Sequence, residues 1–177
     1  MSITKMLTAD QVLRLAGDDV GFISADDLAD IKTTKQLFER FNKIILLYLH
    51  YKSETDMIGH YVCLINHPNS IEFSDSYKMK PDDILMMKSK KDRESTDQTH
   101  NSLARLLYNS GRKIEYNSVQ LQSKDPKVAT CGFWSAIRCR FSDIPIEIWE
   151  QFWRSQKKKH PGKNDLDRLV VRMCNLL

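Results

Sequence analysis

Cys131 and Gly132 stand where the sequence predicts that a helix begins. Residues 133–141 have helical spacing of apolar side chains and contain no Gly or Pro, so Thr130 is the predicted N-cap. The free N–H groups and the positive dipole end of a helix favour a thiolate over a thiol in the first turn. Cys131 is therefore a candidate nucleophile if a base lies beside it. Without one, a buried cysteine simply packs as a small apolar side chain.

His60 and Asp75 are the candidate base and its partner. Two strand-like runs flank the turn-rich tetrapeptide 66–69, which predicts a β-hairpin. If Ile65 faces Ser70 across the turn, His60 lies directly opposite Asp75, with Cβ atoms about 5 Å apart. A carboxylate there would fix the imidazole tautomer and stabilise the imidazolium. The alternative is a surface histidine beside a carboxylate by chance.

A thiolate that attacks a carbonyl group also needs a hydrogen-bond donor for the oxyanion. The backbone N–H of Cys131 is one such donor, and a side-chain amide is commonly another. Gln120 and Gln122 end the strand-like run 116–122, and in a strand, residues two apart point to the same face. Gln122 is the first candidate because it is nearer to the loop before Cys131. Gln120 is the alternative, and either glutamine can equally be a solvated surface residue.

The other elements are mostly helices. The apolar run 44–49 predicts a fully buried central strand. A helix beginning at Ser24, with Asp27 completing a capping box, is also predicted. The helix over 146–155 is expected to bury Ile148, Trp149 and Phe152, and the polar stretch 88–98 is expected to be a loop. Further helices are predicted over 8–16 (capped by Thr8), 33–41, 81–87, 102–108 and 166–177.

Length and composition limit the class of protein. A chain of 177 residues fits one domain, residues 1–177, with an adequate core of its own. No apolar run approaches the roughly 18 residues that a membrane span needs, and the N-terminus lacks a signal-peptide pattern. The four cysteines show no metal-ligand or disulfide spacing. We expect a soluble, intracellular monomer with no metal, no cofactor and reduced thiols, as in the cytoplasm or nucleus.

The net charge of +4 is unevenly distributed. Acidic residues dominate the first thirty positions, whereas a basic cluster lies near the end and comprises Lys157, Lys158, Lys159, His160 and Lys163. Such a cluster is most often a solvated loop. The functional alternative is contact between Lys157, Lys158, Lys159 and Lys163 and the phosphates of DNA.

Taken together, the order His60, Asp75, Gln122 and Cys131-Gly132 resembles the adenain and SUMO-protease superfamily of cysteine peptidases. The pattern is most similar to the capsid-maturation proteases of adenoviruses, virophages and large DNA viruses of eukaryotes. The similarity spans residues 44–141 and includes the buried strand before the histidine. It implies an α+β fold, in which a mixed sheet carrying the histidine and the acid packs on the helix that presents the cysteine.

The resemblance also implies roles for individual residues. Cys131 would be the nucleophile, His60 the general base and then acid, Asp75 its orienter, and Gln122 the oxyanion donor. Tyr61 would lie over the imidazole ring, and Gly132 would permit close packing behind the nucleophile; both would belong to the substrate site.

The function implied is cleavage of capsid precursors at Gly-containing sites, in the virion or in the host cytoplasm or nucleus. Two alternatives remain open. One is a protease that acts on host ubiquitin-like conjugates, and the other is a basic nucleic-acid-binding virion protein without enzymatic activity.

Overall fold

The computed structural model describes residues 2–52, 57–83, 90–95 and 102–177. One five-stranded mixed sheet has the strand order β1-β2-β3-β4-β5. The strands are β1 (Val20–Ser24), β2 (Ile44–Lys52), β3 (Met57–Asn66), β4 (Ser70–Ser74) and β5 (Lys113–Tyr116). The two outer pairs, β1 with β2 and β4 with β5, are parallel, and the two inner pairs are antiparallel. The fold class is therefore α+β, as predicted.

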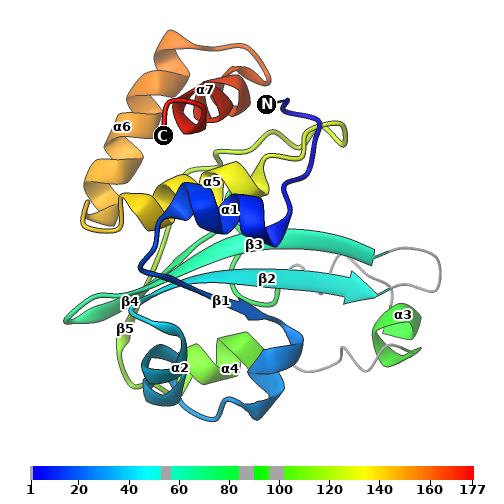
Figure 1. Ribbon diagram of the computed structural model, residues 1–177, viewed down its shortest axis with the longest axis vertical. Coiled ribbons are helices and arrows are strands. Elements are labelled where there is room, and N and C mark those ends of the chain that lie inside the picture. The colour runs from blue at the N-terminus through cyan, green and yellow to red at the C-terminus, as the bar shows by residue number, and fades with distance from the viewer. Residues whose placement is uncertain (1, 53–56, 84–89, 96–101) are drawn as a thin grey trace.

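Helices cover both faces of the sheet (Figure 1). On one face lie α1 (Ala9–Ala16), α5 (Cys131–Arg140), α6 (Ile146–Lys159) and α7 (Asp165–Cys174). On the other lie the short 3-10 helix η1 (Asp26–Asp30), α2 (Thr34–Phe41) and α4 (Ser102–Tyr108). The remaining helix is α3 (Lys90–Ser95). None of the helices in the described ranges is long and apolar enough to cross a membrane.

The inner strand β2 begins with the apolar run 44–47, and both of its faces are covered there. Leu46 packs into the core beneath α1 and α5, whereas its neighbours Ile45 and Leu47 pack into the core beneath α2 and α4. Successive side chains of a strand point to opposite faces, so a strand between two helical layers needs no polar positions. The run 44–49 therefore forms the predicted buried strand.

The predicted helices are present where a polar side chain caps the first turn. The hydroxyl of Thr8 accepts a hydrogen bond from the N–H of Gln11, and the Gln11 side chain accepts one from the N–H of Thr8. Thr33 caps α2 through the N–H of Gln36 at 3.1 Å. These contacts satisfy N–H groups that have no partner within the helix. The predicted helix 102–108 is also present, as α4.

The predicted helix start at Ser24 is wrong in type. Ser24 ends strand β1, and the helix that follows is the 3-10 helix η1. The local contact itself exists, since the N–H and the hydroxyl of Ser24 donate to Oδ2 of Asp27 at 2.9 and 2.6 Å. Within β1, a Cβ on Gly21 would lie 1.5 Å from the carbonyl oxygen of Phe41. Close packing of β1 against the end of α2 therefore requires a glycine at this position.

The predicted register of the β3–β4 hairpin is wrong by two residues. Asn66 pairs with Ile71 and Ile65 pairs with Glu72, so His60 is not opposite Asp75 on the ladder. The cause is a long-range contact: Arg112 donates to the Asn66 side chain at 2.5 Å and also to the backbone carbonyl groups of the turn. A shift of two residues keeps every side chain on its predicted face.

Two other expectations about elements are wrong. The run 116–122 is not a strand, because β5 ends at Tyr116. In α6, Trp149 and Trp153 are buried as expected, but Ile148 and Phe152 are 53% and 43% exposed. The helix turns its tryptophans inward, and the two apolar residues that precede them fall on its outer side. Part of the polar stretch 88–98 forms α3, while most of the predicted helix 81–87 lies outside the described residues.

Candidate active site

His60 and Asp75 form a buried hydrogen bond at the edge between the sheet and α5. Nε2 of His60 lies 2.7 Å from Oδ2 of Asp75, and the two side chains are 3% and 1% exposed. His60 comes from β3, where it pairs with Leu49 of β2. Asp75 directly follows the last residue of β4, so its side chain leaves the ladder and reaches back to the imidazole. The predicted contact is thus present although the predicted register is not.

The turn after β4 fixes the position of the Asp75 carboxylate. Its second oxygen, Oδ1, accepts hydrogen bonds from the N–H groups of Tyr77 at 2.6 Å and Met79 at 3.3 Å. Asn117 holds the backbone of Asp75 from both sides, since its Oδ1 accepts from the Asp75 N–H and its Nδ2 donates to the Asp75 carbonyl, each at 2.7 Å. Asn117 was not singled out in the sequence, because an asparagine after a strand carries no distinctive signal.

Cys131 is the first residue of α5, and its thiol lies beside the His60 ring, which influences its pKa. The side chain of Cys131 is 5% exposed. Burial is the largest single influence and raises the thiol pKa, but it is outweighed by the hydrogen bond and the charge of His60 and by the backbone N–H groups of Tyr61 and Gly132. The net result is a lowered pKa for Cys131. Because Asp75 occupies Nε2, the ring nitrogen left for the thiol is Nδ1.

The pKa of His60 moves in the opposite direction. Burial, the largest single influence, lowers it, but hydrogen bonds and charges from Asp75 and Cys131 together raise the pKa above its usual value. A lowered thiol pKa beside a raised imidazole pKa favours the thiolate–imidazolium ion pair over the neutral pair. Such an arrangement can supply a sulfur nucleophile and a proton donor side by side.

The other cysteines differ from Cys131 in both position and chemistry. Cys63 and Cys139 lie together in the core, with their sulfur atoms 2.8 Å apart. Burial raises the pKa of Cys63 and raises that of Cys174 to about 11. Raised thiol pKa values make these two sulfurs poor nucleophiles at neutral pH. Across the described ranges, no group of three or more His, Cys, Asp and Glu side chains is placed to hold a metal ion.

Gln122 is buried close to the site but is not on a strand. Its Oε1 accepts from the Ser76 hydroxyl at 2.8 Å, and its Nε2 donates to the Tyr77 hydroxyl at 2.8 Å and to the Val128 carbonyl at 3.2 Å. Gln120, in contrast, donates to the backbone carbonyl of Gln122 at 2.9 Å. The two glutamines therefore do not share a face, and Gln122 is the one whose amide nitrogen points toward the Tyr77 side of the site.

The aromatic ring stacked on His60 is that of Tyr77 and not that of Tyr61. The His60 and Tyr77 ring centroids are 5.3 Å apart with an interplanar angle of 26°. Tyr61 is next to His60 on β3, so its side chain points to the other face. There its hydroxyl donates to the Leu7 carbonyl at 3.3 Å and its ring packs in the core. The expectation that Tyr61 covers the imidazole is corrected accordingly.

Gly132 lies at a close contact between α5 and α1. A Cβ at this position would be 2.9 Å from Cγ2 of Val12 and 3.4 Å from both Cβ of Leu7 and Cδ2 of Tyr61. Glycine therefore allows α5 to approach α1 and β3 closely, as expected. Tyr61 and Gly132 both pack behind the nucleophile, and their assignment to the substrate site stays a prediction.

Asp167 of α7 holds the loop that leads to Cys131. Its carboxylate is 1% exposed and accepts hydrogen bonds from the Ser123 N–H at 3.0 Å, from the Trp134 ring N–H at 3.1 Å and from the Thr130 hydroxyl. The Thr130 hydroxyl is thus engaged by Asp167 and does not cap α5. This carboxylate joins both ends of the segment 123–130, and nothing in the sequence pattern indicated it.

The basic cluster lies beside the segment 120–123, at the end of α6 and in the turn that follows. Lys157, Lys158 and Lys159 form the last turn of α6, and Lys163 lies in the turn before α7. Lys163 is paired with Asp125, with 3.3 Å between Nζ and Oδ2. DNA contact through these lysines stays a prediction.

Comparisons with known proteins found a viral relative in sequence and solved structures of low similarity. No family model matches the chain. It is 25% identical over 142 residues to "Uncharacterized protein V9" of Sputnik virophage, covering 80% of this chain and 79% of the relative. The C-terminal Ulp1 protease domain from yeast, in complex with Smt3, has 10% identity and a TM-score of 0.36, covering 92% of this chain and 72% of that one. ChlaDub1 from Chlamydia trachomatis has 11% identity and a TM-score of 0.29, covering 70% and 65% of the two chains.

Proposed function

We propose that this chain is a cysteine endopeptidase that cleaves viral capsid precursors during virion maturation, at Gly-containing sites. The observation that carries the proposal is the position of Cys131 beside the hydrogen-bonded pair His60–Asp75, with a lowered thiol pKa and a raised imidazole pKa. The similarity to a virophage protein supports a viral setting, in the virion or in the host cytoplasm or nucleus. The type of substrate rests on the sequence resemblance.

In the proposed reaction, the Cys131 thiolate attacks the carbonyl carbon of the scissile peptide bond. The carbonyl oxygen becomes an oxyanion, which the Cys131 N–H can stabilise because the first N–H groups of α5 have no acceptor within the helix. Gln122 is the second proposed donor. To act, its amide exchanges the longer bond, to the Val128 carbonyl, for one to the oxyanion.

His60 then completes the two halves of the reaction. The imidazolium gives its proton to the leaving amine as the C–N bond breaks, which leaves a thioester on Cys131. The neutral imidazole next takes a proton from water, whose oxygen attacks the thioester. The C–S bond breaks, the acyl half of the substrate leaves as a carboxylic acid, and the thiolate and the imidazolium are regenerated. Asp75 keeps Nε2 of His60 hydrogen-bonded throughout, which fixes the ring orientation and stabilises its charged form.

Co-expression with candidate virion proteins, read out by mass spectrometry of new termini, tests the proposal. Wild-type protein should generate new termini, and Cys131→Ala should generate none while remaining folded. His60→Ala should lower kcat by several orders of magnitude and Asp75→Asn by less, because an orienter contributes less than the base. Cys174→Ala is the matched control, since its thiol is buried on α7, outside the candidate active site, and should leave cleavage unchanged. Unimpaired processing by Cys131→Ala would refute the proposal.

The same samples separate the two other candidate functions. Fluorogenic ubiquitin and SUMO substrates, assayed beside a capsid-derived peptide, distinguish a protease of modifier conjugates from a capsid protease. Loss of all cleavage, together with equal slow labelling of the four cysteines by a thiol reagent, would instead indicate a binding protein.

A further inference from the structure

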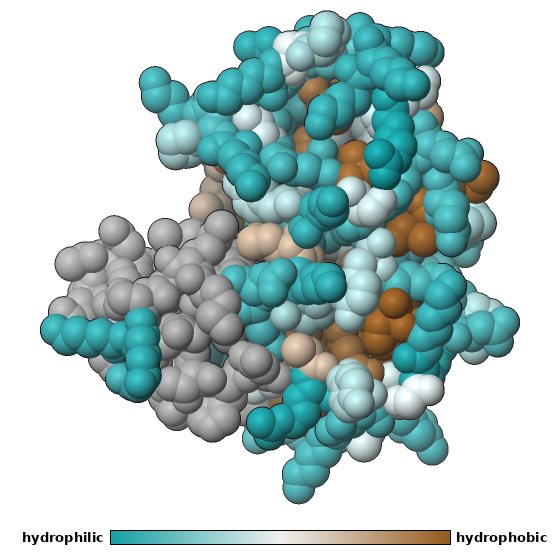
Figure 2. All heavy atoms as spheres, turned by 180° about the vertical axis from the view of Figure 1, so that it is seen from behind, coloured by the Kyte–Doolittle hydropathy of each residue, from teal (hydrophilic) through white to brown (hydrophobic). Residues whose placement is uncertain are grey.

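A groove with basic walls runs beside the candidate active site. Two adjoining cavities form it, with volumes of about 620 and 250 Å³, and both have Gln120 and Lys157 in their walls. One side of the groove is the segment 118–123, which contains Gln122, and the other is the end of α6 with the turn that follows. We call this feature the basic groove. Figure 2 shows hydrophilic side chains over the upper part of the rear face, where α6 and α7 lie.

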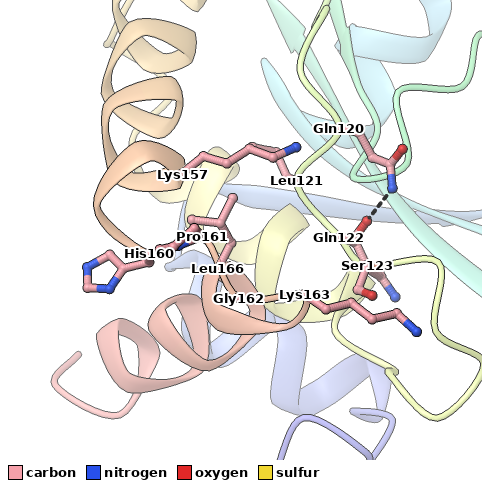
Figure 3. A pocket seen from close by; sticks show the side chains of 10 residues that line it. All are labelled: Gln120, Leu121, Gln122, Ser123, Lys157, His160, Pro161, Gly162, Lys163 and Leu166. Atoms are coloured by element: carbon pink, nitrogen blue, oxygen red, sulfur yellow. Dashed lines mark hydrogen bonds between the residues drawn. The ribbon is translucent and has the colours of Figure 1, made fainter.

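The basic groove carries positive charge that the protein itself does not neutralise. Lys78, Arg154, Lys157 and Lys158 line the larger cavity, and neither cavity has a carboxylate in its lining. Arg154 pairs with Glu150 at 3.5 Å. Within the described ranges, the three lysines form no ion pair. In Figure 3, Lys157 extends from α6 across the groove toward Leu121, so its ammonium group faces the segment that leads to the site.

Lys78 has an unusual backbone conformation for a residue of its type. Its φ of 66° lies in the left-handed region, where a side chain is disfavoured and glycine is not. The turn is held by the Lys78 N–H, which donates to the Asp75 carbonyl at 3.0 Å. A lysine in a position that suits glycine is consistent with a role for its side chain, because strained residues persist mainly where they serve a function.

The basic groove is directly connected to the site. Lys78 follows Tyr77, whose ring stacks on His60. Gln120, in the wall of both cavities, hydrogen-bonds the backbone of Gln122. A chain bound across Cys131 and Gln122 can therefore continue into the groove. We propose that the basic groove binds an acidic stretch of the protein substrate, beside the scissile bond. The inference rests on the proposed function in taking the occupant to be a polypeptide substrate.

The lining favours a polypeptide over nucleic acid. Single-stranded nucleic acids usually bind where aromatic side chains stack on the bases. The larger cavity has no aromatic side chain in its lining, and the His160 ring points away from the smaller one (Figure 3). A nucleic-acid duplex binds cationic side chains that lie on an open protein surface, whereas the cationic side chains of the basic groove face one another across a concavity. An extended peptide has side chains on alternate sides and can therefore present carboxylates to Lys78 on one wall and to α6 on the other.

Binding to the Cys131→Ala variant tests the proposal without cleavage. The probes are a fluorescein-labelled peptide with a run of glutamates beside Gly-Gly and its glutamine isostere, compared by fluorescence anisotropy. The acidic peptide should bind roughly tenfold more tightly at low ionic strength, as two or three exposed ion pairs would produce. The preference should disappear near 1 M salt, where the screening length is about 3 Å. Equal affinities at low salt would overturn the proposal.

Three further variants in the same background locate the effect. Lys157→Glu should abolish the preference, whereas Lys159→Glu, which makes the same charge change on the same helix but lines neither cavity, should retain it. Lys78→Gly should weaken the preference without loss of stability, because it relieves the backbone strain. Equal effects of Lys157→Glu and Lys159→Glu would mean that only net charge matters, and the proposal would fail.

Two further outcomes are informative. Tighter binding of a labelled oligonucleotide than of the acidic peptide, with the same sensitivity to Lys157→Glu, would assign the groove to nucleic acid and overturn the proposal. Cleavage assays with the wild-type chain keep the two proposals apart. If the acidic peptide binds more tightly but no peptide is cleaved, the endopeptidase function alone is refuted. If cleavage occurs at the same rate with and without acidic residues in the substrate, and the two peptides bind equally, the acidic occupant alone is refuted.

Discussion

At the scale of single residues, the site depends on opposing influences on two ionisable groups. Burial by itself would keep both Cys131 and His60 neutral, since it raises a thiol pKa and lowers an imidazole pKa. For Cys131 the burial effect is reversed by His60 and by the backbone N–H groups of Tyr61 and Gly132, and for His60 it is reversed by Asp75 and Cys131. The lowered thiol pKa therefore depends on His60 as well as on the position of Cys131 at a helix start, which was the signal in the sequence.

This dependence predicts the pH profile of thiol alkylation. Iodoacetamide reacts with the thiolate, so in the wild-type protein the midpoint of the pH–rate profile at Cys131 should lie below that of an ordinary thiol, because the Cys131 pKa is lowered. His60→Ala removes an influence that opposes burial and raises that pKa, so the rate at pH 7 should fall by about tenfold or more, because little of the thiol is then ionised. Mass spectrometry of the labelled peptides provides the measurement.

The neighbouring thiols supply the control for that measurement. Cys63 and Cys174 have raised pKa values, so their labelling should be slow at pH 7 and unaffected by His60→Ala. A wild-type profile for Cys131 that follows an ordinary thiol, with a midpoint near about pH 8.5, would mean that no ion pair forms.

At the scale of elements, what could be predicted depended on how local the determining contacts are. The cap of α1 involves residues three apart, so Thr8 was identified from sequence. Strand β1 was missed because its partner β2 lies far along the chain, where Val20 pairs with Ile44. The hairpin register was missed because Arg112, outside the hairpin, binds the turn. Local sequence patterns carry no information about these distant partners.

The residues of the candidate site were also predictable from sequence only in part. The residue types and order of His60, Asp75 and Cys131 sufficed to propose that they meet, because their chemistry is specific. The buried polar residues that hold them in place gave no signal, since Asn117 and Asp167 act only through contacts with distant segments. Tyr77 gave no signal either, because its stacking on His60 depends on a turn whose geometry the sequence does not reveal.

Asp167→Asn tests whether α7 positions the loop that precedes the nucleophile. An asparagine has one acceptor oxygen and turns its amide toward a donor, so a buried N–H or O–H loses its partner. The free energy of unfolding should fall by about 1–3 kcal/mol, measured by urea denaturation. We also expect kcat to fall with little change in KM, because the loop joins Gln122 to Cys131.

Asp165→Asn is the control on the same helix. Its carboxylate accepts from the Gly162 N–H and lies near Arg168 at the surface, so the free energy of unfolding should change by no more than about 0.5 kcal/mol. A destabilised Asp167→Asn variant with unaltered kcat would show that the loop does not position the reacting groups.

At the scale of the whole molecule, the site lies where two layers meet. The sulfur comes from α5, which packs between the sheet and the helices α1 and α7, whereas the imidazole and the carboxylate come from the sheet. If the helical layer moved relative to the sheet, the Cys131 sulfur would separate from the imidazole of His60 and the carboxylate of Asp75. A buried ion pair spans the same junction: Nε and Nη2 of Arg138, on α5, donate to the two carboxylate oxygens of Glu72, on β4, each at 2.6 Å.

Arg138→Met should be strongly destabilising, because it removes the guanidinium group from the fully buried Glu72 carboxylate and leaves it the longer contact with His67, at 3.2 Å. We expect the free energy of unfolding to fall by about 3–5 kcal/mol, measured by urea denaturation. Adding Glu72→Met removes the buried charge, so the double variant should be more stable than Arg138→Met. Recovery should be partial, because the carbonyl groups of Phe141 and Ile144 still lose their donor. A double variant no more stable than Arg138→Met would show that the carboxylate is not the source of the cost.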